Sequence, residues 1–591
     1  MQFESVAKYY EKLEGISSRL EMIDVLTEMF KEVKNHEIRK LIYMTQGVLA
    51  PPYEGIEIGI AEKLVSEAVG RATGYTREDV FAAYKKSGDM GIAAEQIISK
   101  GKLRRMSSNK YSLIEVFDTL KKIAGMSGSG SQDVKIRLMS ELIAASSPIE
   151  GRYIVRFAMG TLRLGLGDAT ILEALSKAST GERKLKPELE NAYNLCSDLG
   201  EVGEVLLKEG TKGIEHFRVT LFKPIRPALA ERLPTAEEIL EKMKGRASVE
   251  SKYDGFRVQV HMDKKSKKVE IFSRRLEKVT HMFPEITKAA LEELNADSII
   301  FDGEAIAYNE VTNEYYPFQE TIQRKRKHGI EEKSAQLPLH VFGFDIMFFN
   351  GEDFMHNGYE KRRKTLEKIV KKNGIIRTSD ERIVTTPKEL ERYFKNAVDE
   401  GLEGIVAKEP NAPYVAGARK FSWIKMKRSY KGELSDTLDL VIIGYYLGRG
   451  QRAEFKFGGL LCAVYNQKSD MFESVTRIGT GFSEKQMSEL QKVLDKAKVK
   501  NKPARVASVV EPDFWVAPKY VVTVRADEIT RSPMHMCGLE KMPDGSEVGY
   551  ALRFPRLVSD GVRGDKSEEE ATTTKEIIEM FNLQKKIRVD S

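Results

Sequence analysis

A lysine beside a tight turn is the first candidate for chemistry in this chain. Lys252 stands in ESKYDGFRVQVH, residues 250–261, where short β-runs flank the turn dipeptide Asp254-Gly255. In an extended strand Glu250 and Lys252 share a face. Such an amine can act as a nucleophile once burial or neighbouring cations depress its pKa. Taken alone, however, the segment is better explained as a surface hairpin with a solvated lysine.

Acidic and basic side chains recur further along the chain. In SIIFDGEAIAY the alternation of a strand places Asp302 and Glu304 on one face, and Glu403 follows in LEGIVAK. Two separated carboxylates are adequate for Mg²⁺, which keeps several waters and substrate phosphates as ligands. Lys425 and Lys427, in FSWIKMK, also share a face. Each of these residues alone is also explained as a solvated charge at a strand end.

Six short motifs follow one another in a distinctive order: Lys-x-Asp-Gly-x-Arg, Ser-Arg, Asp-Gly-Glu, Phe-Asp, Glu-Gly and Lys-x-Lys. This order resembles the covalent nucleotidyltransferases, and more closely the archaeal and eukaryotic ATP-dependent DNA ligases. The resemblance covers nearly the whole chain and is clearest over residues 252–573. It implies a multidomain protein with an all-α DNA-binding domain, an α+β nucleotidyltransferase (adenylation) domain and an OB-fold β-barrel. The implied activity is nick sealing in double-stranded DNA through lysyl-AMP and DNA-adenylate intermediates, in replication, repair and recombination.

The resemblance also implies roles for individual residues. Lys252 would attack the α-phosphorus of ATP, Glu250 would hold the adenine amino group, and Phe344 of VFGFDIMFF would stack on adenine. Glu304 would serve the ribose and, with Glu403, would hold Mg²⁺. The remaining nucleotide contacts would come from basic residues, namely Arg257, Arg274, Arg419, Lys425 and Lys427.

Two pairs of basic residues would act on the phosphates of ATP. Lys425 and Lys427 are expected to neutralise the α-phosphate and to help depress the pKa of Lys252. Near the C-terminus Arg553 and Arg556, in RFPR, would orient the departing pyrophosphate. The stretch LVSDGV that follows departs from the shorter, more basic link of some relatives, so the role of Arg563 stays open.

The elements that must position these residues change in character along the chain. Apolar residues recur at helical spacing in Ala61–Ala68, Leu138–Ala145 and Ile171–Ala178. Three prolines within residues 221–235 indicate a linker, after which short β-runs dominate. We therefore expect a helical DNA-binding domain over 1–220, an adenylation domain over 221–430 and an OB-fold domain over 431–591. The last carries a charged, peripheral helix over 574–586.

Three segments bear on DNA. The Gly/Ser loop at 127–131 precedes a helical pattern, and backbone N–H groups at such a helix start can cradle a phosphate, although a flexible linker explains the loop as well. RFAMGTLRLGLGDATILEAL, residues 156–175, resembles the DNA-binding domain of the same ligases. QRKRKHG, residues 323–329, adds a basic cluster that is also explained as a solvated face.

Composition narrows the setting. The net charge of +7 permits a phosphate-rich partner without requiring one. Three distant cysteines give neither a disulfide framework nor a four-cysteine zinc site. Neither a signal core nor an apolar run of about 20 residues is present, so we expect a cytoplasmic protein without a membrane partner. We also expect a monomer, with a sliding clamp as a candidate partner.

Other classes fit less well. RNA ligases and mRNA-capping guanylyltransferases share the lysine motif but leave the first 220 residues unexplained. NAD-dependent ligases are disfavoured by the missing four-cysteine set. A catalytically inactive duplex clamp would have no reason to assemble Lys252, Glu304, Glu403 and Lys425.

Overall fold

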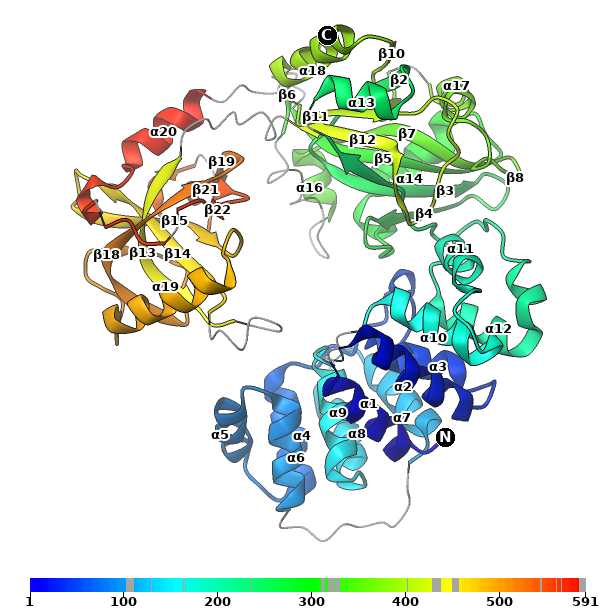
Figure 1. The fold of residues 1–591 in the computed structure, drawn as a ribbon, viewed down its shortest axis with the longest axis vertical. Coiled ribbons are helices and arrows are strands. Elements are labelled where there is room, and N and C mark those ends of the chain that lie inside the picture. The colour runs from blue at the N-terminus through cyan, green and yellow to red at the C-terminus, as the bar shows by residue number, and fades with distance from the viewer. Residues whose placement is uncertain are drawn as a thin grey trace.

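The structure is a computed structural model of the chain. It describes residues 1–591 except 17, 102–110, 129, 163, 165, 234, 310–313, 317–320, 322–323, 325–329, 372, 401, 428–436, 449–456, 543–544, 560, 565 and 584–591. In Figure 1 the described chain forms three bodies, one helical and two rich in strands. Within the described residues, no helix is both long and apolar enough to cross a membrane.

The first body consists of helices around one apolar core, as the sequence predicts. Polar residues begin several helices: Ser112 and Ser147 accept the N3 amide while the N3 glutamate bonds back, which satisfies two backbone donors at each helix start. The three predicted helical stretches lie in α4, α8 and α10. The helices are α1 (Phe3–Glu14), α2 (Arg19–Glu32), α3 (Ile38–Gln46), α4 (Glu62–Thr73), α5 (Arg77–Ser87), α6 (Met90–Ser99), α7 (Leu113–Ala124), α8 (Ser131–Ala144), α9 (Pro148–Ala158), α10 (Asp168–Thr180), α11 (Lys186–Cys196) and α12 (Leu199–Ile214).

The middle body contains two sheets. One has the strand order β1-β12-β11-β2-β10, and the other has the order β4-β3-β5-β7-β8 with β6 on β5 and β9 on β7. Its strands are β1 (Leu229–Arg232), β2 (Ala247–Lys252), β3 (Phe256–Asp263), β4 (Lys268–Ser273), β5 (Ser298–Asn309), β6 (Glu314–Tyr315), β7 (Leu339–Phe349), β8 (Glu352–Asp353), β9 (Ile376–Thr378), β10 (Glu381–Val384), β11 (Gly404–Lys408) and β12 (Arg419–Lys427). Its helices are α13 (Ala236–Lys242), α14 (Pro284–Glu293), α16 (Ile330–Gln336), α17 (Tyr359–Ile369) and α18 (Pro387–Asp399).

The sequence predicts a hairpin around Asp254-Gly255, and this prediction is wrong. β2 pairs with β10 and β11, whereas β3 pairs with β4 and β5, so the turn carries the chain from one sheet to the other. A Cβ on Gly255 would lie 2.2 Å from the carbonyl oxygen of Ala305 on β5, so only glycine allows this close approach. The turn therefore places Lys252 between the two sheets.

The third body is an OB-like β region. One sheet has the order β16-β18-β13-β14-β15-β17 with β22 on β18, and the other has β19-β21-β20. Its elements are β13 (Leu438–Tyr446), β14 (Gly459–Asn466), β15 (Met471–Ile478), α19 (Glu484–Ala497), β16 (Lys498–Val499), β17 (Val506–Ala507), β18 (Phe514–Arg525), β19 (Glu528–Ser532), β20 (Cys537–Lys541), β21 (Glu547–Arg553), β22 (Arg556–Leu557) and α20 (Thr574–Leu583).

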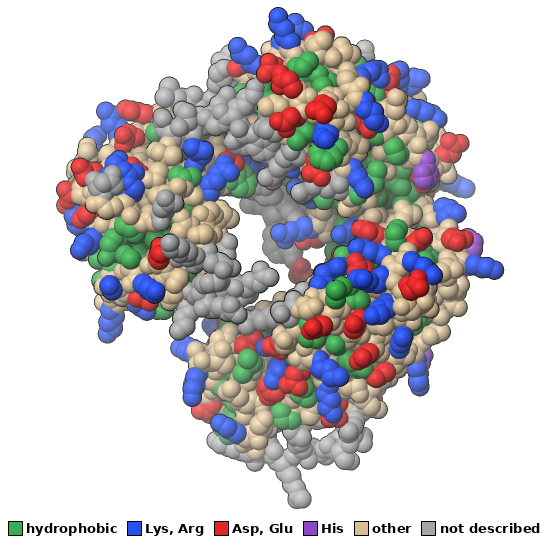
Figure 2. Space-filling model, in the orientation of Figure 1, with side chains coloured by type: hydrophobic (Ala, Val, Ile, Leu, Met, Phe, Trp, Pro, Cys, Tyr) green, Lys and Arg blue, Asp and Glu red, His purple; other side chains and the backbone are tan. Residues whose placement is uncertain are grey.

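The last helix, α20, is not peripheral, contrary to the expectation from its charge. Ile577 is fully buried in the barrel core, and Ile578 and Phe581 are partly buried against it. The charged side chains therefore mark only the outer face of an amphipathic helix. In Figure 2 an opening separates the three bodies, and Lys and Arg side chains lie along part of its rim.

Candidate active site

A cavity of about 500 Å³ lies between the two sheets of the middle body. Seven of the residues expected at the site line it, namely Glu250, Lys252, Arg257, Arg274, Glu304, Phe344 and Lys425. Lys408, Ser379 and Trp423 also line the cavity and were not expected from the sequence. The cavity thus brings together side chains from β2, β3, β5, β7, β11 and β12.

Lys252 lies at the end of β2 with its ammonium group in contact with the carboxylate of Glu403. Burial lowers the pKa of Lys252, but the negative charges of Glu403 and Glu304 raise it by more. The pKa of Lys252 therefore lies above its ordinary value. The expected depression by Lys425 and Lys427 is therefore not seen in this arrangement. Lys427 instead contacts Glu403, which neutralises part of its positive charge.

The two expected metal carboxylates have different surroundings. Burial raises the pKa of Glu304 to about 7, and the positive charge of Lys252 offsets this only in part. Burial also raises the pKa of Glu403, but the charges of Lys252 and Lys427 lower it to about 2. Hard oxygen donors of this kind fit Mg²⁺, and the described residues hold no cluster of three or more protein ligands, so phosphate and water would complete the coordination.

The side chain of Arg257 is held in place by hydrogen bonds. Its guanidinium donates to Asp302 at 2.5 Å and to the carbonyl oxygen of Ala228 at 2.7 Å. Tyr414 also donates to Asp302, at 2.7 Å. The buried Nε of Arg257 has no hydrogen-bond partner among the described residues.

Glu250 lies among groups that the sequence does not point to. Lys408 approaches its carboxylate at 3.0 Å, the Tyr359 hydroxyl donates to it, and Arg363 lies 3.7 Å away. Burial lowers the pKa of Lys408, and Glu250 offsets part of that effect. One sequence signal could have found Lys408, because it is the only charged residue among the five of β11.

The aromatic residues of β7 differ in their surroundings. Phe344 lines the cavity and meets Trp423 edge-to-face at 6.0 Å between ring centroids, with the Arg257 guanidinium 5.3 Å from its ring centre. Phe342 is buried and stacks on Tyr253 at 4.0 Å. Phe348 and Phe349 are only partly buried, each against an apolar cluster.

The C-terminal arginines lie in different places. Arg553 crosses from the barrel to Asp254 at 2.5 Å, two residues after Lys252, and also meets Glu528 at 3.3 Å. Arg556 stays on the barrel in a pair with Asp527 at 2.7 Å. Arg563 pairs with β18 through its backbone and donates to Thr523 at 3.0 Å, so it holds the barrel together.

The other basic candidates also differ. Arg274 is exposed at the cavity mouth, whereas the side chain of Arg419 lies outside the described part. Of the basic cluster 323–329, Arg324 alone is described. It is buried and ion-paired with Glu285, so it is not part of a solvated basic face. The remaining residues of that cluster lie outside the described residues.

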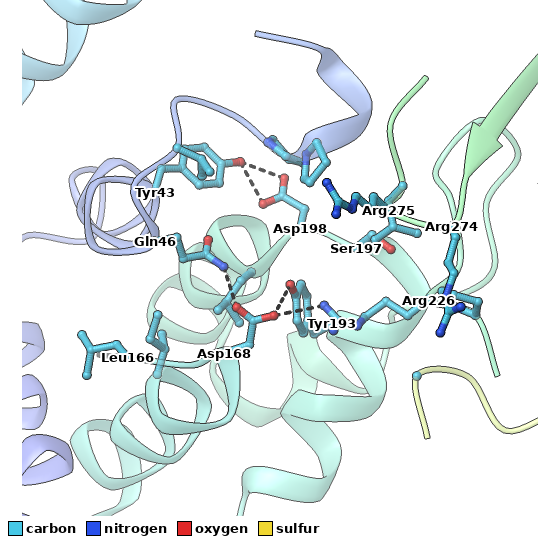
Figure 3. A pocket seen from close by; sticks show the side chains of 18 of the residues that line it. Tyr43, Gln46, Leu166, Asp168, Tyr193, Ser197, Asp198, Arg226, Arg274 and Arg275 are labelled. Atoms are coloured by element: carbon cyan, nitrogen blue, oxygen red, sulfur yellow. Dashed lines mark hydrogen bonds and ion pairs between the residues drawn. The ribbon is translucent and has the colours of Figure 1, made fainter. Parts of the chain in front are cut away.

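A second cavity, also about 500 Å³, lies where the helical and middle bodies meet (Figure 3). Asp168 at the start of α10 accepts hydrogen bonds from Gln46 at 3.0 Å, Tyr193 at 2.8 Å and Arg226 at 3.1 Å. Arg226 belongs to the linker that follows α12. Arg274 and Arg275 line this cavity, and both also line the first. The two cavities are therefore neighbours, joined by Leu229 of β1 and by a short basic segment after β4.

Comparison with known proteins decides the family. Sequence models of the N-terminal, central and C-terminal regions of ATP-dependent DNA ligases match residues 2–176, 227–427 and 453–566. The chain belongs to the ATP-dependent DNA ligases. The probable DNA ligase of Dictyoglomus turgidum is 46% identical over all of this chain and 99% of its own length. The DNA ligase of Saccharolobus solfataricus is 41% identical, over all of this chain and 99% of its own.

A solved structure, Pmar-Lig_PreS3, is similar in fold to this chain. The TM-score is 0.55 at 19% identity, over 94% of this chain and 99% of that one. The three-part fold expected for such a ligase is thereby confirmed. ATP is the nucleotide and DNA the partner of this family, and the cavity between the two sheets lies wholly within the matched central region.

Proposed function

We propose that this ligase stores AMP on Lys252 and seals nicks in duplex DNA from that intermediate. Nζ of Lys252 bonds to the α-phosphorus of ATP while the bond to the bridging oxygen breaks and pyrophosphate leaves. AMP then passes to the 5′-phosphate at a nick, and the 3′-hydroxyl displaces it. The observation that carries the proposal is that Lys252 lines a cavity together with six other candidate residues while its ammonium contacts Glu403.

The surrounding residues have distinct tasks in this proposal. Glu403, in contact with Nζ, would orient the amine of Lys252, and the proton that Lys252 must lose would pass to solvent. Glu304 and Glu403 would hold Mg²⁺, which when bound supplies positive charge to the phosphate oxygens. Phe344 and Glu250 bind the adenine, and Arg257, Arg274 and Lys425 bind the ribose and phosphate side.

The C-terminal arginines complete the pocket. Arg553, which reaches the turn after Lys252, orients the pyrophosphate, and Arg556 assists from its place on the barrel. Arg419 and Lys427 add positive charge near the α-phosphate. We assign DNA binding to residues 1–220, adenylation to 221–430 and the barrel to 431–591. The ligase acts as a cytoplasmic monomer in this proposal, and a sliding clamp is its candidate protein partner.

The test is covalent labelling. Incubation with ATP and Mg²⁺ should add one AMP to the intact protein, and the Lys252→Arg variant should add none while binding nicked duplex normally. Labelled Lys252→Arg protein would overturn the assignment, as would labelling of the native enzyme at another residue in a peptide map.

A further inference from the structure

One helix packs against the part of the cavity wall that contains Glu250 and Phe344. α17 (Tyr359–Ile369) carries Tyr359, Arg362 and Arg363, which are spaced so that they share one face of the helix. All three are buried, with exposed fractions of 1%, 0% and 4%. Buried polar side chains of this size must be paired, and their partners lie at the cavity wall.

The first partner of this face is Glu250. The Tyr359 hydroxyl donates to Oε1 of Glu250, and Arg363 lies 3.7 Å from the same oxygen. Arg363 also donates to the hydroxyl of Ser379 at 2.7 Å, and Ser379 lines the cavity. Tyr359 and Arg363 therefore fix a carboxylate and a wall residue together.

The second partner is the strand that carries Phe344. Arg362 donates twice to Asp345, at 2.7 and 3.0 Å, and both side chains are fully buried. A bidentate pair of this kind fixes direction as well as distance. Because Asp345 follows Phe344 on β7, the same helix face supports the aromatic wall of the cavity.

The chemistry of this arrangement bears on the choice of base. An ionised carboxylate only accepts hydrogen bonds. The 6-amino group of adenine donates to it, whereas the 6-oxygen of guanine is an acceptor and is repelled. A carboxylate free to rotate would discriminate less, because it could turn away from a mismatched base.

We propose that α17 sets the base selectivity of this ligase, with Tyr359 as the positioning residue that aims Glu250 at the 6-amino group of adenine. The inference rests on the proposed contact between Glu250 and adenine. It goes beyond that contact because it assigns selectivity to residues outside the nucleotide pocket.

Tyr359→Phe tests the inference, since it removes one hydroxyl and keeps the ring. The rate of enzyme adenylation is measured with ATP and with purine riboside triphosphate, which lacks the 6-amino group. We expect KM for ATP to rise about tenfold with little change in kcat. The values for purine riboside triphosphate should stay unchanged, because that base makes no use of Glu250. A purely structural defect would weaken both nucleotides alike.

Tyr393→Phe is the matched control. Tyr393 is a buried tyrosine that bonds Ser251 and Asp380 beside the same strand, β2, but does not touch Glu250. Its loss should leave the ratio of the two nucleotides unchanged. Should Tyr359→Phe not fold, Arg363→Lys is the second variant, because it keeps the charge and loses the paired contacts with Ser379.

Glu250→Ala, which removes the acceptor altogether, separates the inference from the assignment on which it rests. If Glu250→Ala leaves the preference for ATP over purine riboside triphosphate intact, the adenine contact itself is wrong. If that variant abolishes the preference while Tyr359→Phe and Arg363→Lys both keep it, the contact stands and the role of α17 is overturned. Loss of the preference in all of these variants supports the inference.

Discussion

Lys252 is protonated in this arrangement, because the carboxylates around it outweigh the effect of burial on its pKa. The second-order rate constant for adenylation reports the ionisation of the free enzyme. We therefore expect this constant, measured in single turnover, to rise by about tenfold per pH unit from pH 7.5 to 9, above the pKa of about 7 of Glu304. A plateau below pH 8 would instead indicate the depressed lysine pKa that the basic residues of FSWIKMK suggest.

His261 gives a second prediction at this scale. It is fully buried on β3, where its Nδ1 accepts a hydrogen bond from the backbone of Phe222 in the linker, and burial lowers its pKa from 6.5 to about 3. The unfolded chain therefore binds the proton more tightly than the folded protein. Stability is unaffected above about pH 6.5 and is lost as pH falls towards 3, at up to about 1.4 kcal/mol per pH unit.

His261→Asn should flatten this dependence, because asparagine can accept the same hydrogen bond without titrating. Urea unfolding between pH 7 and 4.5 measures it. In a Trp515→Phe background, Trp423 remains the single tryptophan and reports on the middle body. An equal slope in both proteins would assign the acid sensitivity to other groups.

The residues of the site were easier to predict than their partners. Lys252, Glu304 and Lys425 stand in ordered motifs, so their sequence positions alone point to one site. Tyr359 and Arg363 lie in no such motif, and their partner Glu250 is more than 100 residues away. Only the folded chain brings these side chains together, and the direction of the Lys252 pKa shift depends on the same long-range contacts.

At the scale of elements, the turn between β2 and β3 matters most. Gly255→Ala would place a methyl group against the backbone of Ala305, and such overpacking costs about 1–3 kcal/mol. We expect adenylation to fall sharply because the turn and Lys252 must move, while nick binding by the helical body persists. Gly564→Ala is the control, since an added Cβ there meets nothing within 4 Å. Normal labelling of Gly255→Ala would show that the turn tolerates displacement.

The periodicities of the sequence predicted helices and strands well but not their neighbours. Asp254-Gly255 is typical of a hairpin, yet β2 and β3 pair with other strands because long-range pairing with β11 and β5 buries both of them. The sequence predicts a peripheral last helix because charged side chains are spread along it. Its apolar side chains, such as Ile577, nevertheless reach the barrel core.

At the scale of the whole molecule, the contact of the barrel with Asp254 distinguishes two steps of the reaction. Arg553→Ala should slow enzyme adenylation by about 100-fold, because it removes the one basic side chain that the barrel pairs with the turn after Lys252 in the described contacts. Sealing of a nick that already carries AMP should change much less. Both rates are measured on the same preparation. The control is Arg531→Ala, because Arg531 lies on β19 and pairs with Glu540 on β20. Equal losses in both steps would mean that Arg553 acts generally on stability.

That single contact also has a consequence for the order of events. While Arg553 holds Asp254, the barrel is tied to the turn after Lys252, and we expect that an enzyme recharging in this arrangement does not bind a nick at the same moment. An enzyme that dissociates after transferring AMP to DNA, and is adenylated again before it rebinds, cannot seal the nick that it activated. A high ATP concentration should therefore leave adenylated, unsealed strands, and a lower ATP concentration should allow them to be sealed.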